Sequence, residues 1–428
     1  MAEIVAGLWA AEEVVSTGIY AGVAGHVVTK PTMPLKATFT QIGATSDDAS
    51  KSSLIRSHHT LTILAHRAYI FGGQTSQGKL ATSNMHSIAL PSSSTDTPEY
   101  RVLPPIAAEA DGPIPAPRTM HAACALNNHV VIYGGVDETG NPLDEGATVL
   151  WLYDTEKLSW GTLEPASHLE RAPPPRSQAR LLAHKDGNLI LLGGRDAKAK
   201  GGADRTDAWH FDFFTKTWNQ LPHVPGTSIT SAAVAGDTLY VISGSDTLSS
   251  EIHRLEIKLY AEEPPTWETI SFPTNPLAPG PRPRSNGGLI PVTTGYGRNY
   301  LLYFFGDRQD ATDKEGGLLQ WSDLWTFQLP SSDVEVKATT TKVAEAIKPA
   351  KIKDAIRSKF GAETGNLTWA EVEVQPPGDL QEHEGKVHPG PRSSFGYDVT
   401  SDGQSVVMWG GSDAKGEPEG DGWIIRLS

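Results

Sequence analysis

Short apolar segments recur along the chain, and most of them end at a pair of glycines. The pairs are Gly72-Gly73, Gly134-Gly135, Gly193-Gly194 and Gly410-Gly411, with partial copies at Ser243-Gly244 and Gly306-Asp307. Runs this short, rich in β-branched and aromatic residues and bounded by glycine and proline, predict β-strands rather than helices.

A second mark alternates with the glycines, in which an aromatic residue is followed three positions later by an aliphatic one. Its six copies are Phe39–Ile42, Tyr100–Leu103, Trp160–Leu163, Trp218–Leu221, Trp267–Ile270 and Trp369–Val372. A fixed order of such marks over a period of about 50–60 residues is typical of a propeller of four-stranded blades. The third strands are predicted at Met85–Leu90, Val149–Thr155, Ala208–Phe214, Ile252–Ile257, Leu324–Leu329 and Gly422–Leu427.

One copy of the aromatic mark precedes the first blade. The sequence stops at Leu427-Ser428, directly after the third strand of the sixth blade. Phe39–Ile42 is therefore predicted to supply the missing fourth strand and so to close the ring.

Composition narrows the classes of function. The formal net charge is −14, which argues against a general affinity for nucleic acid or anionic membrane. Cys124 is the only cysteine, so no intrachain disulfide can form. Glu3, Glu12 and Glu13 precede the first basic residue, Lys30, unlike the start of a secretory signal. We expect a cytoplasmic protein without a membrane span.

Three marks recur in fixed order over residues 37–428, and together they resemble kelch repeats. They are the Pro-Arg pair that opens a blade, as in Pro117-Arg118, the paired glycines and the Trp-x-x-Leu strand. The sequence is similar in particular to cytosolic kelch proteins of filamentous fungi. The resemblance implies an all-β, six-bladed kelch-type propeller.

Two segments lie outside the repeat. Residues 1–36 form an N-terminal extension, and residues 331–366 interrupt the fifth blade. Pro349, the apolar Ile352, Ile356 and Phe360, and Gly361 predict a helix in the second segment. Strand directions place both on one face of blades 5 and 6, where we expect them to pack together as a small, mostly helical cap.

The opposite face collects the polar candidates for a binding site. Each of five blades opens with an arginine expected near the channel mouth, and the loops after the glycines reach the same rim. The candidate ligand-binding residues are Arg56, Arg118, Arg176, Arg180, Arg284, Arg392, Arg195 and Arg308. Clustered guanidinium groups bind carboxylate, sulfate or phosphate. The alternative for each arginine that opens a blade is a structural role, tying adjacent blades together through backbone or loop acids.

Two functions follow, and the sequence does not choose between them. The resemblance to kelch propellers implies that this face binds a partner, here an anionic small molecule or peptide. The alternative is a cofactor-independent cyclase or isomerase of fungal specialised metabolism, in which His59 or His121 moves protons beside the arginines.

We expect neither a metal nor a cofactor. The iron-binding Glu-x-x-x-Asp-x-x-x-His run of some kelch enzymes has its nearest counterpart at Gln375, Asp379 and His383, where glutamine replaces a ligand. Cys124 follows His121 much as in copper-radical oxidases of related design, but Ser177–His184 holds no partner tyrosine. A copper-radical oxidase is therefore not expected.

Overall fold

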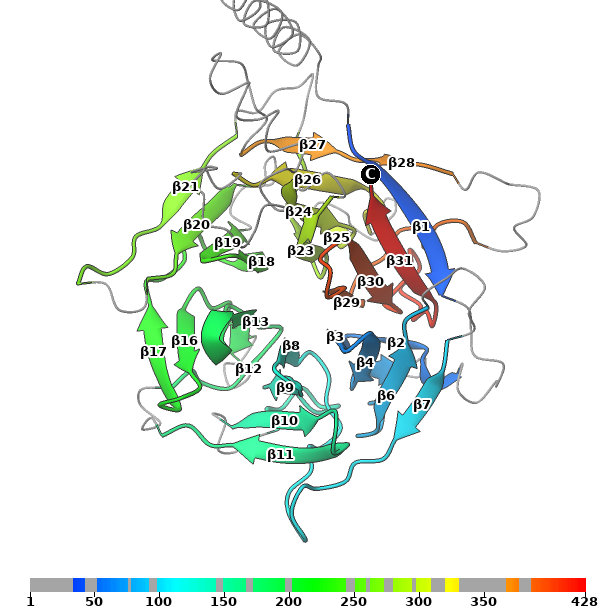
Figure 1. Cartoon of the computed structure of the whole chain (residues 1–428), viewed down its shortest axis with the longest axis vertical. Helices are drawn as coiled ribbons and strands as arrows, with labels where there is room; N and C mark the ends of the chain where they lie inside the picture. The colour runs from blue at the N-terminus through cyan, green and yellow to red at the C-terminus, as the bar shows by residue number, and fades with distance from the viewer. Residues whose placement is uncertain are drawn as a thin grey trace, which may run out of the picture.

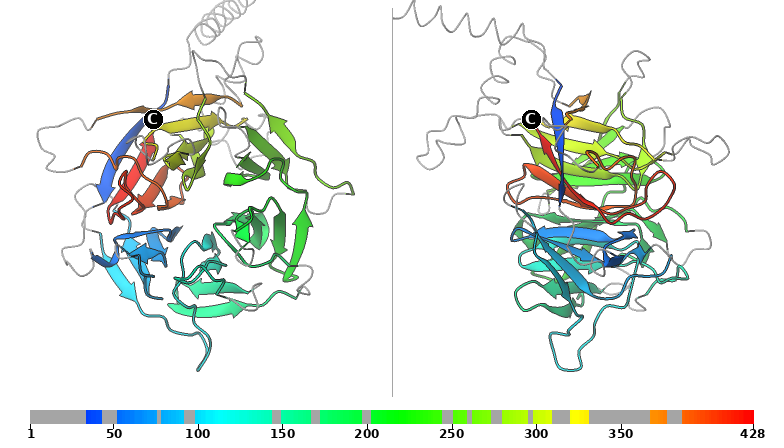
Figure 2. Two further views of the ribbon diagram at one scale, coloured as in Figure 1. Left: turned by 180° about the vertical axis from the view of Figure 1, so that it is seen from behind. Right: turned by 90° about the vertical axis from the view of Figure 1, so that its right-hand side faces the viewer.

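The chain folds into a ring of six β-sheets around a central channel (Figure 1). The computed structural model describes residues 34–42, 52–75, 78–91, 98–143, 149–166, 172–196, 202–243, 251–258, 262–272, 280–294, 298–308, 320–330, 367–376 and 386–428. Seen from the side, the sheets stack around the ring axis as the blades of a propeller (Figure 2).

Each of the first five blades is a four-stranded antiparallel meander. Blade 1 contains β3 (Thr60–Leu64), β4 (Arg67–Phe71), β6 (Met85–Ala89) and β7 (Tyr100–Leu103). Blade 2 contains β8 (Ala122–Leu126), β9 (His129–Tyr133), β10 (Leu150–Asp154) and β11 (Ser159–Leu163). Blade 3 contains β13 (Arg180–His184), β14 (Asn188–Leu192), β16 (Ala208–Asp212) and β17 (Thr217–Leu221), with the 3₁₀ turn η2 (Lys185–Gly187) after β13.

The second half of the ring repeats this order. Blade 4 contains β18 (Ile229–Ala235), β19 (Thr238–Ser243), β20 (Ile252–Glu256) and β21 (Glu268–Ile270). Blade 5 contains β23 (Gly288–Thr293), β24 (Asn299–Phe304), β26 (Leu324–Gln328) and β27 (Trp369–Glu371). Blade 6 contains β29 (Gly396–Val399), β30 (Ser405–Trp409) and β31 (Gly422–Leu427). All six predicted third strands are confirmed to within two residues at either end.

The N-terminal strand completes blade 6, as predicted. β1 (Lys36–Ile42) pairs antiparallel with β31, from Ala37 opposite Leu427 to Ile42 opposite Gly422. Blade 6 also has a fifth strand that was not predicted, β28 (Glu373–Val374), which runs parallel to the start of β1. This pairing joins the link that follows blade 5 to the outer edge of blade 6.

The hydrophobic core lies between the blades rather than within them. Each sheet is covered on both faces by its two neighbours in the ring. Six clusters of buried side chains therefore fill the six interfaces between neighbouring sheets. The cluster between blades 6 and 1 includes Ile42, Leu61, Val407 and Trp409. A residue of the N-terminal strand thus belongs to the core that joins the two ends of the ring.

Three short ladders connect the arginine segments to the loops that follow the glycines. They are β2 (Arg56–Ser57) with β5 (Gln74–Thr75), β12 (Arg176–Ser177) with β15 (Arg195–Asp196), and β22 (Arg284–Ser285) with β25 (Asp307–Arg308). The predicted sharing of one rim by these segments and loops is therefore confirmed. The arginines stand four residues before the innermost strands, instead of beginning them.

The glycine pair of blade 5 was placed one residue too late. Phe305 and Gly306 have φ of 54° and 101°, matching Gly72 and Gly73 at 62° and 91°. Phe305 therefore occupies the first position of the pair, and Asp307 belongs to the loop strand β25. The second position excludes a side chain, since a Cβ on Gly306 would lie 2.8 Å from the carbonyl oxygen of Ser285.

The predicted helical insert at 331–366 and residues 1–33 of the N-terminal extension lie outside the described residues. Their packing together stays a prediction. No helix in the described ranges has the length and apolar character needed to cross a membrane.

Closure by β1 can be tested at Ile42, whose side chain is 2% exposed between blades 6 and 1. We expect Ile42→Ala to lower the free energy of unfolding by about 2–5 kcal/mol, because it leaves a cavity in this interface. Gln41→Ala, at the exposed neighbouring position, should change it by less than about 0.5 kcal/mol. Chemical denaturation of both variants measures the difference, and equal stabilities would contradict the assigned role of β1.

Candidate functional site

The arginines that open five of the blades are buried and not exposed to solvent. Arg56, Arg118, Arg176, Arg284 and Arg392 are each at most 2% exposed. A guanidinium group at such depth requires hydrogen-bond partners, because burying an unpaired charge is costly. The partners show what these side chains do.

Each of these guanidinium groups binds the exit of the second strand in its own blade. The Nη1 group donates to a main-chain carbonyl at the first position of the glycine pair. The acceptors lie at 2.9–3.2 Å and belong to Gly72, Gly134, Gly193, Phe305 and Gly410.

The main chain of the same arginines reaches the preceding blade. The carbonyl of Arg118 accepts a hydrogen bond from Gly73 N–H at 2.9 Å, and that of Arg176 accepts one from Gly135 N–H at 3.1 Å. Gly306 and Gly411 donate in the same way to Arg392 and Arg56, at 2.8 and 2.9 Å. One residue therefore fastens its own blade and the neighbouring blade, at four of the six interfaces.

Three of the arginines also form ion pairs, of which the Arg176–Asp207 pair is buried on both sides. Arg176 binds both carboxylate oxygens of Asp207, at 2.9 and 2.8 Å, while Arg284 and Arg392 bind Asp323 and Asp421. Burial alone would raise the pKa of Asp207, but hydrogen bonds and charge from Arg176 hold it below its usual value. Asp421 follows the same pattern beside Arg392.

These acids share a short motif, Asp-x-Trp, that was not predicted from the sequence. They stand in Asp207-Ala-Trp209, Asp323-Leu-Trp325 and Asp421-Gly-Trp423. In the first two, the tryptophan Nε1–H donates to the same carboxylate at 2.7 Å. This Asp-x-Trp triplet at the start of the third strand could have identified the arginine's ion-pair partner from the sequence.

The five arginines therefore act as ties within their blades, and four of them also join neighbouring blades, which is the structural alternative that the sequence left open. Their binding of an anion stays a prediction without support from this geometry. Arg195 lies on the loop strand of blade 3, more than half exposed, and pairs with Asp204 at 3.2 Å. Arg308 stacks over the ring of Trp321, with 4.4 Å from its guanidinium carbon to the ring centroid.

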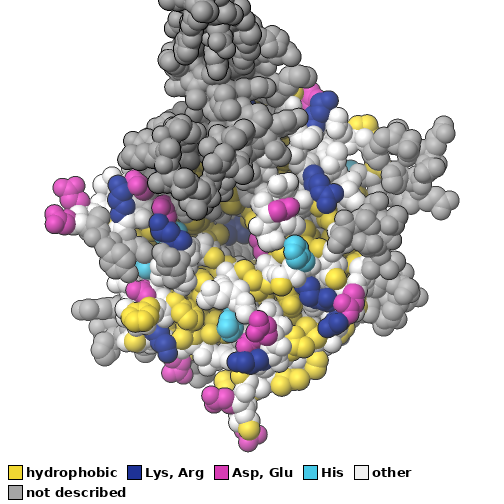
Figure 3. All heavy atoms as spheres, in the orientation of Figure 1, with side chains coloured by type: hydrophobic (Ala, Val, Ile, Leu, Met, Phe, Trp, Pro, Cys, Tyr) yellow, Lys and Arg dark blue, Asp and Glu magenta, His cyan; other side chains and the backbone are white. Residues whose placement is uncertain are grey.

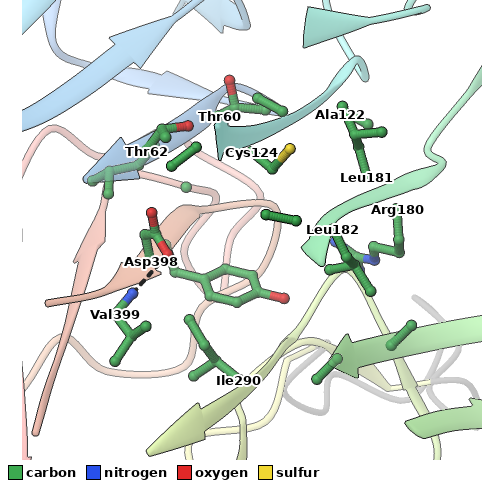
Figure 4. Close-up of a pocket in the computed structure, with 18 of the residues that line it drawn as sticks. Thr60, Thr62, Ala122, Cys124, Arg180, Leu181, Leu182, Ile290, Asp398 and Val399 are labelled. Atoms are coloured by element: carbon green, nitrogen blue, oxygen red, sulfur yellow. Dashed lines mark hydrogen bonds between the residues drawn. The ribbon is translucent and has the colours of Figure 1, made fainter. Parts of the chain in front are cut away.

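The channel holds a cavity of about 340 Å³ lined by the innermost strands of all six blades. Apolar side chains dominate its wall, among them Leu181, Leu182 and Ile290 (Figure 4). On the face seen in Figure 3, hydrophobic side chains gather around the centre, and charged side chains lie mostly further out. Cavities of this size and character bind small ligands or single side chains.

Both candidate histidines border the cavity. Nε2 of His121 lies 2.8 Å from Thr60 Oγ1, and His59 Nε2 accepts the main-chain N–H of Gly396 at 3.3 Å. Burial, and then the charge of Arg118, lower the pKa of His121 to about 3. Burial and the charge of Arg56 lower the pKa of His59 well below its usual value. Both rings are therefore neutral at neutral pH.

Arg180 is the predicted binding arginine that the structure places on the cavity wall. It is partly exposed, and its Nη2 donates to the carbonyl of Thr230 in blade 4 at 3.3 Å. Its side chain points into the cavity from β13 (Figure 4). Arg180 thus differs from the five tying arginines in both burial and surroundings.

Two polar wall residues of blade 6 were not singled out from the sequence. Asp398 Oδ2 accepts the N–H of Ile63 in blade 1 at 2.7 Å, and its Oδ1 accepts the N–H of Val399 at 2.8 Å. The hydroxyl of Tyr397 accepts the N–H of Leu289 in blade 5 at 3.2 Å. These side chains satisfy donors on the open edges of innermost strands, which no further strand covers.

The repeat itself carried the signal for Asp398. Counting six residues from the opening arginine reaches Thr62, Cys124, Leu182, Ile290 and Asp398 in blades 1, 2, 3, 5 and 6. An acid at a position that is apolar or neutral in the other blades stands out once the blades are aligned.

Cys124 lies on the same wall, partly exposed. Burial, and then the negative charge of Asp398, raise the pKa of its thiol. The thiol is therefore protonated and weakly nucleophilic at neutral pH.

The tie in blade 3 can be tested by removing one partner of its ion pair. We expect Arg176→Ala to lower the free energy of unfolding by about 3–5 kcal/mol, because Asp207 is left charged and buried. Arg195→Ala removes an exposed pair in the same blade and should cost less than about 1 kcal/mol. Unfolding in denaturant distinguishes the two, and a small loss at Arg176 would refute the tie.

The pH dependence of stability should reveal Asp398. Burial raises its pKa to about 6, although two main-chain N–H groups favour the ionised form. The folded state therefore binds a proton more tightly than the unfolded state, so the contribution is full below pH about 4 and is lost as the pH rises through about 6.

We expect this loss to amount to at most about 3 kcal/mol. Asp398→Asn should abolish it, so that the difference in unfolding free energy between the two proteins changes between pH 4 and 7. A constant difference over this range would rule out a raised pKa at Asp398.

Comparison with solved structures supports the architecture. The fold is similar to the chain described as "Structure of YjhT", with a TM-score of 0.52, 12% sequence identity and coverage of 94% of this chain and 99% of that one. At this identity the likeness concerns the fold alone.

The chain is also similar to several kelch-containing proteins. Human Kelch domain-containing protein 3 is 24% identical over 292 residues, which cover 64% of this chain and 68% of the relative. The flagellar outer arm dynein alpha chain of Chlamydomonas reinhardtii is 24% identical over 194 residues, and dynein regulatory complex subunit 7 of the same organism is 30% identical over 157. Those matches span only 4% and 12% of the two dynein-related proteins, and 43% and 36% of this chain.

The chain also matches a described protein family, over a longer stretch than it matches either dynein-related protein. It runs from residue 58 to residue 285, more than half of the chain, and covers blades 1 to 4. The chain therefore belongs to the KLHDC2/KLHL20/DRC7 Kelch-repeats domain family.

Proposed function

We propose that this kelch propeller is a binding module whose channel receives an anionic group of a small molecule or peptide, with Arg180 as its anchor. One observation carries the proposal: Arg180 is a partly exposed cation on the wall of a largely apolar cavity. An exposed guanidinium group beside apolar side chains suits a ligand with an anionic head and a hydrocarbon body.

The electrostatic setting supports this choice. The formal net charge of the chain is −14, so a cation inside the channel is a local exception in an acidic protein. Such a site selects ligands by the contact itself, since long-range attraction would not draw an anion to this surface.

The alternative, a cyclase or isomerase using the same pocket, has less support. It requires His59 or His121 to exchange protons at neutral pH, and the low pKa of both rings makes them poor bases and keeps them from acting as acids. It also requires arginines that stabilise a developing negative charge, whereas five of them bind main-chain carbonyls.

A cytoplasmic location is part of the proposal. A protonated, partly exposed thiol at Cys124 on the cavity wall is best preserved in a reducing compartment. Similarity to fungal members of the family stays a prediction.

Hexanoate and hexyl sulfate are suitable probes, because each joins an anionic head to an apolar chain. We expect isothermal titration calorimetry to detect binding of at least one of them to the full chain. Arg180→Gln should weaken it about tenfold or more, since a charged hydrogen bond is lost.

Arg254→Gln serves as the matched control, because Arg254 pairs with Glu268 on the outer strands of blade 4. This variant should bind as the original protein does. Binding that survives Arg180→Gln unchanged, or an absence of binding by both probes, would overturn the proposal.

A further inference from the structure

The cavity wall carries one positive and one negative charge. Among the described residues that line it, the ionisable groups other than the thiol and phenol are Arg180, Asp398, His59 and His121. The two histidines are neutral at neutral pH. The ligand therefore meets a guanidinium group and a carboxyl group in otherwise uncharged surroundings.

The two charges lie on opposite sides of the channel. Arg180 extends from blade 3 toward blade 4, where it binds the carbonyl of Thr230. Asp398 extends from blade 6 toward blade 1, where it accepts the N–H of Ile63. In a ring of six these two interfaces are diametrically opposed, and Figure 4 shows the two residues on opposite sides of the cavity.

The charges also lie at different depths. Arg180 stands four residues after Arg176, and Asp398 stands six residues after Arg392. The innermost strands are parallel to one another around the ring, so Asp398 lies two residues, about 7 Å, further from the arginine rim. A ligand that touches both must hold its charged groups several bonds apart.

Both groups keep hydrogen-bonding capacity for a ligand. A guanidinium group has five N–H donors, and in the described part of the chain Arg180 uses one, on Thr230. A carboxylate has about four acceptor sites, and Asp398 uses two, on Ile63 and Val399. The apolar stretch between them, with Leu181, Leu182 and Ile290, suits a hydrocarbon spacer.

We propose that the channel recognises a zwitterion, such as an ω-amino acid or a short peptide with free ends, whose anionic group binds Arg180 and whose cationic group binds Asp398. This inference rests on the proposed function and adds the second charge to it. The cation is what distinguishes such a ligand from a simple carboxylate, because it requires a partner acid at the far side of the cavity.

The test compares 6-aminohexanoate with hexanoate and hexylamine in calorimetric titrations of the full chain at pH 7.5. The three probes share one chain length and differ only in their charged ends. We expect 6-aminohexanoate to bind about tenfold or more tightly than either partner probe, because it alone satisfies both charges. Glycine, whose charges are too close together to reach both groups, should bind no better than acetate.

Asp398→Asn should remove the advantage of 6-aminohexanoate over hexanoate. Arg180→Gln should remove its advantage over hexylamine. Should Asp398→Asn fail to fold, the comparison of the three probes on the unaltered protein still decides the question.

Equal affinities for hexanoate and 6-aminohexanoate, both dependent on Arg180, would overturn the zwitterion and leave the proposed anion site intact. Binding of none of the three probes, together with no binding of hexyl sulfate, would overturn both. An advantage of 6-aminohexanoate that persists in Asp398→Asn would also contradict the assignment of the cationic group.

Discussion

The structure depends on a repeated bond between an arginine and a pair of glycines. The guanidinium group holds the end of the second strand in its own blade, and the carbonyl of the same residue accepts an N–H from the blade before it. Because the hydrophobic core lies between blades, the stability of the fold depends on how neighbouring sheets are positioned against each other. The arginine sets that position at the channel end of four of the six interfaces.

Blade 4 shows what replaces this bond. It has no opening arginine, so no arginine carbonyl is available to the glycine pair of blade 3. The side chain of Ile229 packs against Gly193, and Arg180 reaches across to Thr230. The residue on which the proposed site depends therefore also contributes to the interface that lacks a tie. The proposed binding site and the interface without an arginine tie share one side chain.

Much of the fold followed from the sequence, because it depends on local marks. The paired glycines require positive φ, and the aromatic residues of the outer strands fill the interfaces, so each mark has a direct physical cause. Closure by Phe39–Ile42 could be predicted because one aromatic mark precedes the first blade, while the sixth blade has none after its third strand. The position of Phe305 could not, since a bulky residue at φ 54° carries no glycine-like signature.

The site was predicted less well, and for a reason that the arginines make clear. Sequence identifies a guanidinium group but not its partners. The five arginines that recur in the repeat form their hydrogen bonds inside the protein. Arg180 and Asp398, which break the repeat, are the ones that border the cavity. In a repeat protein, residues common to all units maintain the units, whereas departures from the repeat are better candidates for function.

Closure by β1 has a consequence for how the protein is made. Ile42 pairs with Gly422, 380 residues later (422 minus 42). At a synthesis rate of about 5–20 residues per second, β1 waits roughly 20 to 80 seconds on the ribosome before its partner strand exists. Blades 1 to 5 can assemble during this interval, while an apolar strand edge stays unpaired and exposed to wrong partners. The last hydrogen bonds of the ring thus form only once β31 has left the ribosome.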